Sequence, residues 1–401
     1  MMKIIITLFL ILSITLQIHN IYTYPPTRGF DSLGHIQNIT KMQSEKRLLL
    51  PEETPQSYHP PLYYLVASSF PNLKIVQWFN FLVLLTLGAL VFYFFKRVID
   101  STIPALSFLL LMTSLPVVVY MVPQISNEFF SAVLISSTLI FYYFKRELLG
   151  KFSNQIILGM LVGLSLLSKS TALVFFLTIL IDQLILNKLD FKKYFFSTYL
   201  LFFSSLLISG WFYIRNFLYY GNPLVTNIDF PQWQYFQEPG FRDLLFYINL
   251  KPFLYFDLFH AHWYSFWGGT FYSFFYDGSN ALIPVQQFSK AGVLLVIQSL
   301  PFVYLFFKGC IHTLRSPSSR GKFFLLYISL LFMAYFFYTL KLPFYSAVKA
   351  SYLLSLVVPF TYFVNKGLEK SLVLKAAFPF YVCIYTLVVI KNFWIQTYWM
   401  R

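Results

Sequence analysis

Residues 75–97 read IVQWFNFLVLLTLGALVFYFFKR, an apolar run that carries no charge before Lys96-Arg97. A helix needs about 20 predominantly apolar residues to cross the hydrocarbon core of a bilayer. The stretch therefore predicts a membrane-spanning helix that ends at a basic loop. Comparable runs occur along the whole chain, at 4–22, 103–122, 129–144, 156–168, 171–187, 194–214, 291–307, 323–340, 350–364 and 371–391.

The composition agrees with a membrane protein of about eleven spans. The chain has 401 residues, of which 58% are hydrophobic and 11% charged, whereas soluble domains carry about 25% charged residues. The net charge of +15 lies mostly in loops between apolar runs, which argues against a nucleic-acid partner. Cys310 and Cys383 fall at or within apolar segments and suggest no disulfide framework. We expect one all-α polytopic domain over residues 1–401.

The distribution of Lys and Arg predicts the orientation. Residues 4–22 are followed by no small-residue cleavage site, so we expect an uncleaved first span with a cytoplasmic N-terminus. Alternate loops are then basic, as the positive-inside rule requires, and an eleven-span chain ends outside. The inside loops carry Lys96, Arg97, Lys145, Arg146, Lys151, Lys188, Lys192, Lys193, Lys308, Arg315, Arg320, Lys322, Lys366, Lys370 and Lys375.

Two predicted outside segments are long, 23–74 and 215–290. Most acidic residues also fall outside: Asp31, Glu45, Glu52, Glu53, Glu128, Asp229, Glu238, Asp243, Asp257 and Asp277. Long ordered loops often carry function, so we expect any site on this side of the membrane.

The first outside segment contains Gly29-Phe30-Asp31 and His35. A helix that starts near Asp31 places Asp31 and His35 on one face at i, i+4. Asp31 is either a helix cap or a general base at the membrane surface. Further on, His59-Pro60-Pro61-Leu62-Tyr63-Tyr64 is either an interfacial anchor or a part of the same site.

Charged residues in the short outside loops are candidates for the same site. Glu128 either faces water and caps its helix, or joins Asp31 as a second acidic group or metal ligand. Lys169, Arg215 and Lys349 are either snorkelling residues or a set of cations that neutralises a lipid phosphate. His260 and His262 have no carboxylate or cysteine at a diagnostic metal spacing, and we interpret them as structural or substrate-facing.

Several short motifs occur in order over residues 1–360: Phe30-Asp31 with His35, residues 59–64, Ser126-Asn127-Glu128, residues 163–169, Arg215-Asn216 with 220–223, and Lys349 with Tyr352 in residues 349–354. Together they resemble the GT-C superfamily of membrane glycosyltransferases, in its protein O-mannosyltransferase and lipid A aminoarabinose-transferase-like branch. Three features depart from the family pattern, and one of them is that the second-loop acid, often Asp in relatives, is Glu128 here. Ser32 stands where many relatives have a second acidic residue, and Lys349 replaces a nearby arginine.

The resemblance implies a GT-C-like bundle that transfers a sugar from a polyprenyl-phosphate donor to a lipid, glycan or protein acceptor on the extracytoplasmic face. It implies catalytic roles for Asp31, Glu128 and His35, with Asp31 as the base of an inverting reaction. The donor phosphate is then bound by Lys169, Arg215, Lys349 and Tyr352. The residues implied to contact the substrate are His59, Tyr63, Asn127 and Asn216. A divalent metal, if one is used, would be held by Asp31 and Glu128.

The resemblance also implies partners and a location: a polyprenyl-phosphate sugar, membrane lipids, and a bacterial cytoplasmic membrane. Three other functions compete. A transporter or flippase of a lipid-linked or sugar substrate predicts polar residues near the membrane midplane, where the chain has few. A noncatalytic scaffold predicts that Asp31 tolerates mutation. A ligase or polymerase of surface glycans predicts products longer than one sugar.

Overall fold

The computed structural model describes residues 1–226, 229–230, 232, 242–278, 282, 290–316, 320–341 and 347–395. Within these ranges every regular element is a helix, which confirms the all-α class. The predicted outside segment 215–290 is described only in part, and Glu238 lies outside the described residues.

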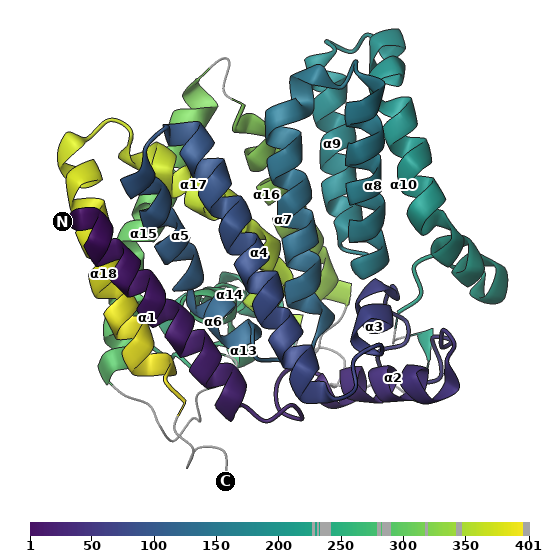
Figure 1. Cartoon of the computed structure of the whole chain (residues 1–401), viewed down its shortest axis with the longest axis horizontal. Coiled ribbons are helices and arrows are strands. Elements are labelled where there is room, and N and C mark those ends of the chain that lie inside the picture. Colours follow the sequence, from purple (N-terminus) through teal and green to yellow (C-terminus); the bar gives the residue numbers. More distant parts are fainter. Residues whose placement is uncertain are drawn as a thin grey trace.

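Six of the described helices are long and apolar enough to cross a membrane. They are α1 (Met2–Thr23), α4 (Leu73–Ile99), α10 (Phe191–Tyr220), α15 (Lys290–Arg315), α16 (Lys322–Lys341) and α18 (Leu372–Phe393). At 1.5 Å per residue, helices of this length match the roughly 30 Å hydrocarbon core. The long helices run side by side in one bundle (Figure 1), and they are compatible with a multi-pass membrane protein.

The other five predicted spans correspond to shorter or broken helices. They are α5 (Thr102–Thr113) with α6 (Pro116–Met121), α7 (Asn127–Lys145), α8 (Phe152–Ser168), α9 (Ala172–Leu186), and η6 (Ala350–Leu356) with α17 (Val357–Leu368). The predicted span 103–122 breaks because Pro116 disfavours helical geometry at Leu115, whose backbone is extended. The count of eleven spans stays a prediction.

Loops that we predicted on one side of the membrane meet in the structure. Arg320 pairs with Glu147 of the short helix η1 (Arg146–Leu148) at 2.8 Å, and Arg146 donates to the Arg320 carbonyl at 3.0 Å. The connection between α7 (Asn127–Lys145) and α8 (Phe152–Ser168), which contains η1, lies at the upper end of the bundle in Figure 1, and we call this end the basic end. The predicted outside segment with α2 (Ser32–Glu45) lies at the opposite end, the α2 end. Which end faces the cytoplasm stays a prediction.

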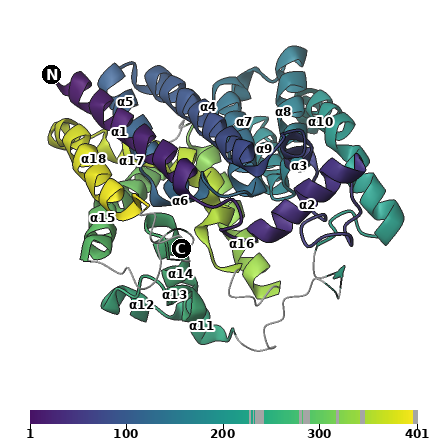
Figure 2. The same ribbon diagram turned by 60° about the horizontal axis from the view of Figure 1, so that its bottom comes forward.

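The first outside segment folds into a small layer across the α2 end (Figure 2). Helix α2 and the short helix α3 (Leu62–Ala67) share a small apolar core that includes Ile39, Met42 and Tyr64. This core holds α2 against the ends of the spans, so the residue at its N-terminus has a fixed position.

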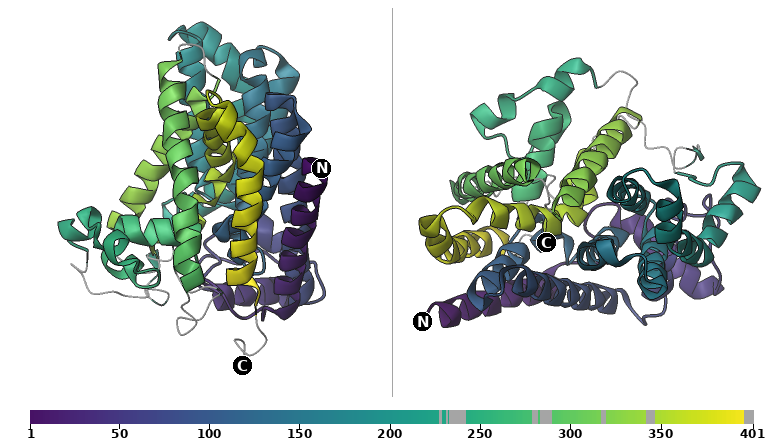
Figure 3. Two further views of the ribbon diagram at one scale, coloured as in Figure 1. Left: turned by 90° about the vertical axis from the view of Figure 1, so that its left-hand side faces the viewer. Right: turned by 90° about the horizontal axis from the view of Figure 1, so that it is seen from above.

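The described part of the second outside segment forms short helices at the same end, visible at the lower left of Figure 3. They are α11 (Leu244–Ile248), α12 (Lys251–Tyr255), α13 (Ala261–Tyr264) and α14 (Phe266–Phe275). Ser273 of α14 accepts a hydrogen bond at 2.8 Å from the backbone N–H of Ala350. Gly269 lets the chain before η6 approach closely, because a Cβ there would lie 2.8 Å from Val348. Helix α14 therefore fixes the segment that carries Lys349.

Candidate functional site

A tight turn presents Asp31 at the α2 end. Gly29 has a φ of +119°, and a Cβ there would lie 2.7 Å from the side-chain oxygen of Gln124. The same oxygen accepts a hydrogen bond at 2.9 Å from the backbone N–H of Phe30. Asp31 follows in the left-handed region with a φ of 54° and precedes α2, but its side chain makes no capping hydrogen bond. The carboxylate therefore does not serve as a helix cap.

The Asp31 carboxylate faces Lys349. Lys349 Nζ donates to Asp31 Oδ2 at 3.3 Å, and the lysine side chain is 4% exposed whereas the aspartate side chain is 50% exposed. The ammonium also lies 4.7 Å from the ring centre of Phe30 and 5.2 Å from that of Tyr352. The charge of Lys349 holds the pKa of Asp31 below its usual value. Asp31 is therefore an ionised carboxylate that is partly open to solvent.

A second ion pair, between Glu128 and Lys169, lies next to the first. Both partners sit at helix ends whose dipoles suit their charges: Glu128 in the first turn of α7 and Lys169 directly after α8. The Lys169 ammonium lies 5.0 Å from the centre of the Tyr352 ring, which Lys349 also contacts. Burial lowers the pKa of Lys169, and the neighbouring Glu128 opposes that effect. Tyr352 thus connects two lysine–carboxylate pairs into one cluster, which we call the four-charge cluster.

Two histidines border the four-charge cluster. His35 is buried, and its Nδ1 lies 2.8 Å from the hydroxyl of Tyr64. The ring of His59 is nearly parallel to it, with centroids 6.1 Å apart. Burial lowers the pKa of His35 to about 3 and that of His59 well below its usual value. Both rings are therefore neutral at physiological pH, and His35 bonds to Tyr64 instead of holding Asp31.

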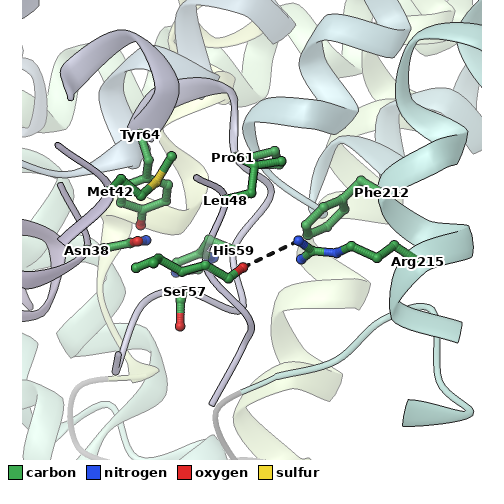
Figure 4. Close-up of a pocket in the computed structure, with 10 residues that line it drawn as sticks. Asn38, Met42, Leu48, Ser57, His59, Pro61, Tyr64, Phe212 and Arg215 are labelled. Carbon is green, nitrogen blue, oxygen red and sulfur yellow. Dashed lines mark hydrogen bonds between the residues drawn. The ribbon is translucent and has the colours of Figure 1, made fainter. Parts of the chain in front are cut away.

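Arg215 and Asn216, near the end of α10, lie on the other side of His59. Arg215 and His59 line a small cavity together (Figure 4), where Arg215 donates to the carbonyl of Leu49 at 3.4 Å. The guanidinium also stacks on Phe212, 5.1 Å from the ring centre. Asn216 is buried and accepts from Arg215 at 3.4 Å. The structure thus brings two of the three predicted phosphate-binding cations together and places Arg215 apart from them.

The remaining predicted substrate contacts are buried. Tyr63 packs in the apolar core below α2, with its ring 5.9 Å from Phe130. Asn127 is 1% exposed, and within the described part of the chain its amide nitrogen and oxygen have no hydrogen-bond partner. A buried amide without partners is unfavourable, and Asn127 directly precedes Glu128 in the first turn of α7.

The sequence did not single out two residues of this region. The hydroxyl of Tyr338 lies 3.3 Å from that of Tyr352, and Gln124 fixes the Gly29–Phe30 turn. Tyr338 lies in a predicted span, and the whole chain has 49 Phe and 30 Tyr, so no signal distinguished it. Gln124 lies in the same short outside turn as Glu128, and this position could have identified it as a residue of the site.

The arrangement of the carboxylates does not suit a metal ion. Among the described residues, no group of three or more His, Cys, Asp or Glu side chains is placed to hold one. Asp31 and Glu128 each face a lysine instead, and a lysine repels the divalent cation that the two carboxylates would bind. His260 pairs with Asp257 at 3.2 Å and is exposed. The residues of the four-charge cluster therefore do not fit a divalent metal.

Comparisons with protein-family models, with curated proteins and with solved structures gave no match for this chain.

Proposed function

We propose that this protein is a membrane glycosyltransferase that moves a sugar from a polyprenyl-phosphate donor to an acceptor hydroxyl. The GT-C resemblance suggests the reaction, and the four-charge cluster is the observation that carries it. Two buried lysines beside a half-exposed carboxylate match the two needs of such a transfer. One need is a cationic site for the departing lipid phosphate, and the other is an ionised base for the acceptor.

Asp31 is the proposed base. A general base must be unprotonated before the reaction, and Lys349 keeps the pKa of Asp31 low. The solvent-exposed Asp31 carboxylate accepts the proton of the acceptor hydroxyl. At the same time the hydroxyl oxygen attacks the anomeric carbon of the sugar. The bond from that carbon to the phosphate oxygen breaks on the opposite face, so the configuration inverts. The logic is that of inverting glycosidases, with an acceptor in place of water.

Lys349 and Lys169 are the proposed phosphate ligands. The departing polyprenyl phosphate gains negative charge, and preorganised cations in a water-poor site stabilise such charge strongly. Both ammonium groups face Tyr352, so one phosphate near this ring can contact both. Lys349 then contacts the donor phosphate and Asp31 together. Asn127 and His59 supply neutral polar contacts to the sugar or the acceptor.

An apolar cavity of about 440 Å³ supports a lipid donor. It lies between α8, α9 and α10, the first two of which flank the turn that carries Lys169. Its lining suits an isoprenoid chain because it is almost wholly apolar. The lining residues include Leu166, Leu173, Phe176, Phe202, Leu206, Tyr213, Ile214 and Phe217.

The proposal includes a location in the bacterial cytoplasmic membrane with the α2 end outside. The basic end carries the loops rich in Lys and Arg, which the positive-inside rule assigns to the cytoplasm. An impermeant thiol reagent tests this on intact cells. A cysteine at exposed Thr40 of α2 should react, and a cysteine at exposed Lys192 at the basic end should react only after lysis. The reverse pattern would contradict the orientation.

The experiment that tests the activity uses purified protein in nanodiscs, a panel of polyprenyl-phosphate sugars, and cell-envelope acceptors. Mass spectrometry then measures free polyprenyl phosphate. We expect release from at least one donor, with the sugar recovered on an acceptor and the anomeric configuration inverted. A folded, monodisperse protein that releases polyprenyl phosphate from no donor would rule out the proposal. Movement of intact donor across vesicles in the same preparation would point to transport.

A further inference from the structure

A third cavity lies at the basic end of the bundle, opposite the end that holds the four-charge cluster. It has a volume of about 670 Å³ and lies between the C-terminal half of α15 and the end of α17. The two helices cross closely here, because a Cβ on Gly309 would lie 1.9 Å from the carbonyl of Phe363, and a Cβ on Gly367 would lie 2.2 Å from that of Leu305. This close crossing brings the ends of two helices into one groove.

Basic side chains from both helices line this groove. They are Lys308, His312, Arg315, Lys366 and Lys370. None of the described residues that line the cavity is acidic. Nearby Glu369 pairs with Lys366 at 2.6 Å, which leaves the groove with a net positive charge. The positive-inside rule explains why this end is basic, but it does not explain why cations from two helices converge on one cavity.

The groove continues into an apolar strip on α15. Tyr304, Phe307 and Ile311 line the same cavity and are 63%, 59% and 49% exposed. Their spacing of i, i+3 and i+7 places them on one helix face, together with Lys308 at i+4 and Arg315 at i+11. The groove therefore combines cations with an exposed apolar strip suited to acyl chains, and Lys308 lies 5.9 Å from the Tyr304 ring centre within that strip.

We propose that this groove binds the headgroup of an anionic phospholipid, with its acyl chains along the exposed face of α15. Basic pockets between membrane helices at the cytoplasmic side bind anionic headgroups of this kind. Arg315 and Lys370 bind the headgroup phosphate from opposite walls, and Tyr304 and Phe307 contact the first methylenes of the chains. A soluble phosphate would make no use of the apolar strip. The inference does not depend on the proposed sugar transfer, because it concerns the other end of the molecule.

The test is a lipid titration of the full chain in detergent, followed by native mass spectrometry. The probes are dioleoyl phosphatidylglycerol, dioleoyl phosphatidylcholine and soluble glycerol phosphate. The groove variant is Arg315→Gln with Lys370→Gln, two exposed positions at which folding should be unaffected. The matched control is Lys151→Gln with Lys192→Gln, which removes two exposed cations of the same end outside the groove.

We expect the groove variant to weaken binding of phosphatidylglycerol by about 10- to 30-fold. Binding of phosphatidylcholine should not change, and the control should match the wild type. An equal loss in both variants, or no loss in either, would overturn the proposal because the effect would then come from general charge. Glycerol phosphate that binds as tightly as the lipid would overturn it too, by identifying a site for a soluble anion.

Discussion

The two ends of the bundle use the same kind of residue in opposite ways. At the α2 end, Lys169 and Lys349 are buried and each faces a carboxylate. At the basic end, the groove between α15 and α17 holds several partly exposed cations and, among the residues that the structure describes, no lining carboxylate. A balanced, buried cluster costs free energy to assemble and fixes the position of each charge, whereas an unbalanced, exposed one attracts an anion without fixing it.

This difference indicates where chemistry is possible. Catalysis requires charged groups that are already in place before charge develops on the substrate. Helix ends, the Tyr352 ring and the contact between α14 and η6 supply that preorganisation for the four-charge cluster at the α2 end. Substitutions in the four-charge cluster distinguish a catalytic centre from a purely structural one.

The largest expected effect comes from Asp31→Asn. Loss of the base should reduce the rate of sugar transfer by about 10²–10⁴-fold. Asparagine tolerates the φ of 54°, so the turn at Asp31 is kept, and Tm should fall because the buried Lys349 loses its charged partner. The matched control is Asp100→Asn, which has a φ of 52° near the basic end. Transfer is measured as polyprenyl phosphate released per minute. Equal rates in the two variants would remove Asp31 from the mechanism.

Lys349→Gln should reduce transfer by about 10²-fold, the size of effect that follows the loss of one group stabilising a developing anion. It should also change the pH profile. Lys349 is the main cause of the lowered pKa of Asp31, so its removal raises that pKa. The acidic limb of kcat/KM should then move to higher pH. A limb that stays in place would contradict the coupling between Asp31 and Lys349.

Glu128→Gln should lower the thermal stability of the protein. It leaves the buried Lys169 without its partner, and breaking a buried ion pair costs about 3–5 kcal/mol. The double variant Glu128→Gln with Lys169→Gln removes both charges and should recover part of the lost Tm. Scanning fluorimetry in one detergent compares the three proteins. A double variant less stable than Glu128→Gln would show that the pair is not the source of the effect.

The smallest expected effect concerns His35. Its folded-state pKa is about 3, below the unfolded value of about 6.5. The stability that neutral His35 contributes is therefore fully present above the unfolded-state pKa of about 6.5, and it is lost as the pH falls toward 3. His35→Gln should reduce the difference in Tm between pH 7 and pH 5. The same change at exposed His260 should leave that difference as in the wild type, and a reduction in both would point to a general effect of acid.

Much of the architecture could be predicted from the sequence because span length, charge-free runs and basic loops are local properties. The charge pattern also predicted that the segments of Asp31, Glu128, Lys169 and Lys349 lie on one side, and the structure brings these four side chains together. The break at Pro116 was missed because residues 103–122 are uniformly apolar and length alone suggested one span.

Other features depend on contacts between distant segments. The sequence could not show that Arg215 faces Leu49 instead of the lysines, because α10 packs on the first outside segment only in the folded chain. Tyr338 contacts Tyr352 across two helices, and nothing distinguishes it from the many other tyrosines. The cap hypothesis for Asp31 was reasonable from spacing, but the turn at Gly29 directs the carboxylate to Lys349.

The most direct test separates donor binding from chemistry in a single turnover. Wild type, Asp31→Asn and Lys349→Gln are mixed with an excess of protein over the donor found in the panel, and bound donor and released polyprenyl phosphate are measured separately. We predict that Asp31→Asn binds the donor but does not release polyprenyl phosphate, whereas Lys349→Gln binds it weakly. Release by Asp31→Asn at the wild-type rate would contradict the assignment of the four-charge cluster as the site of transfer.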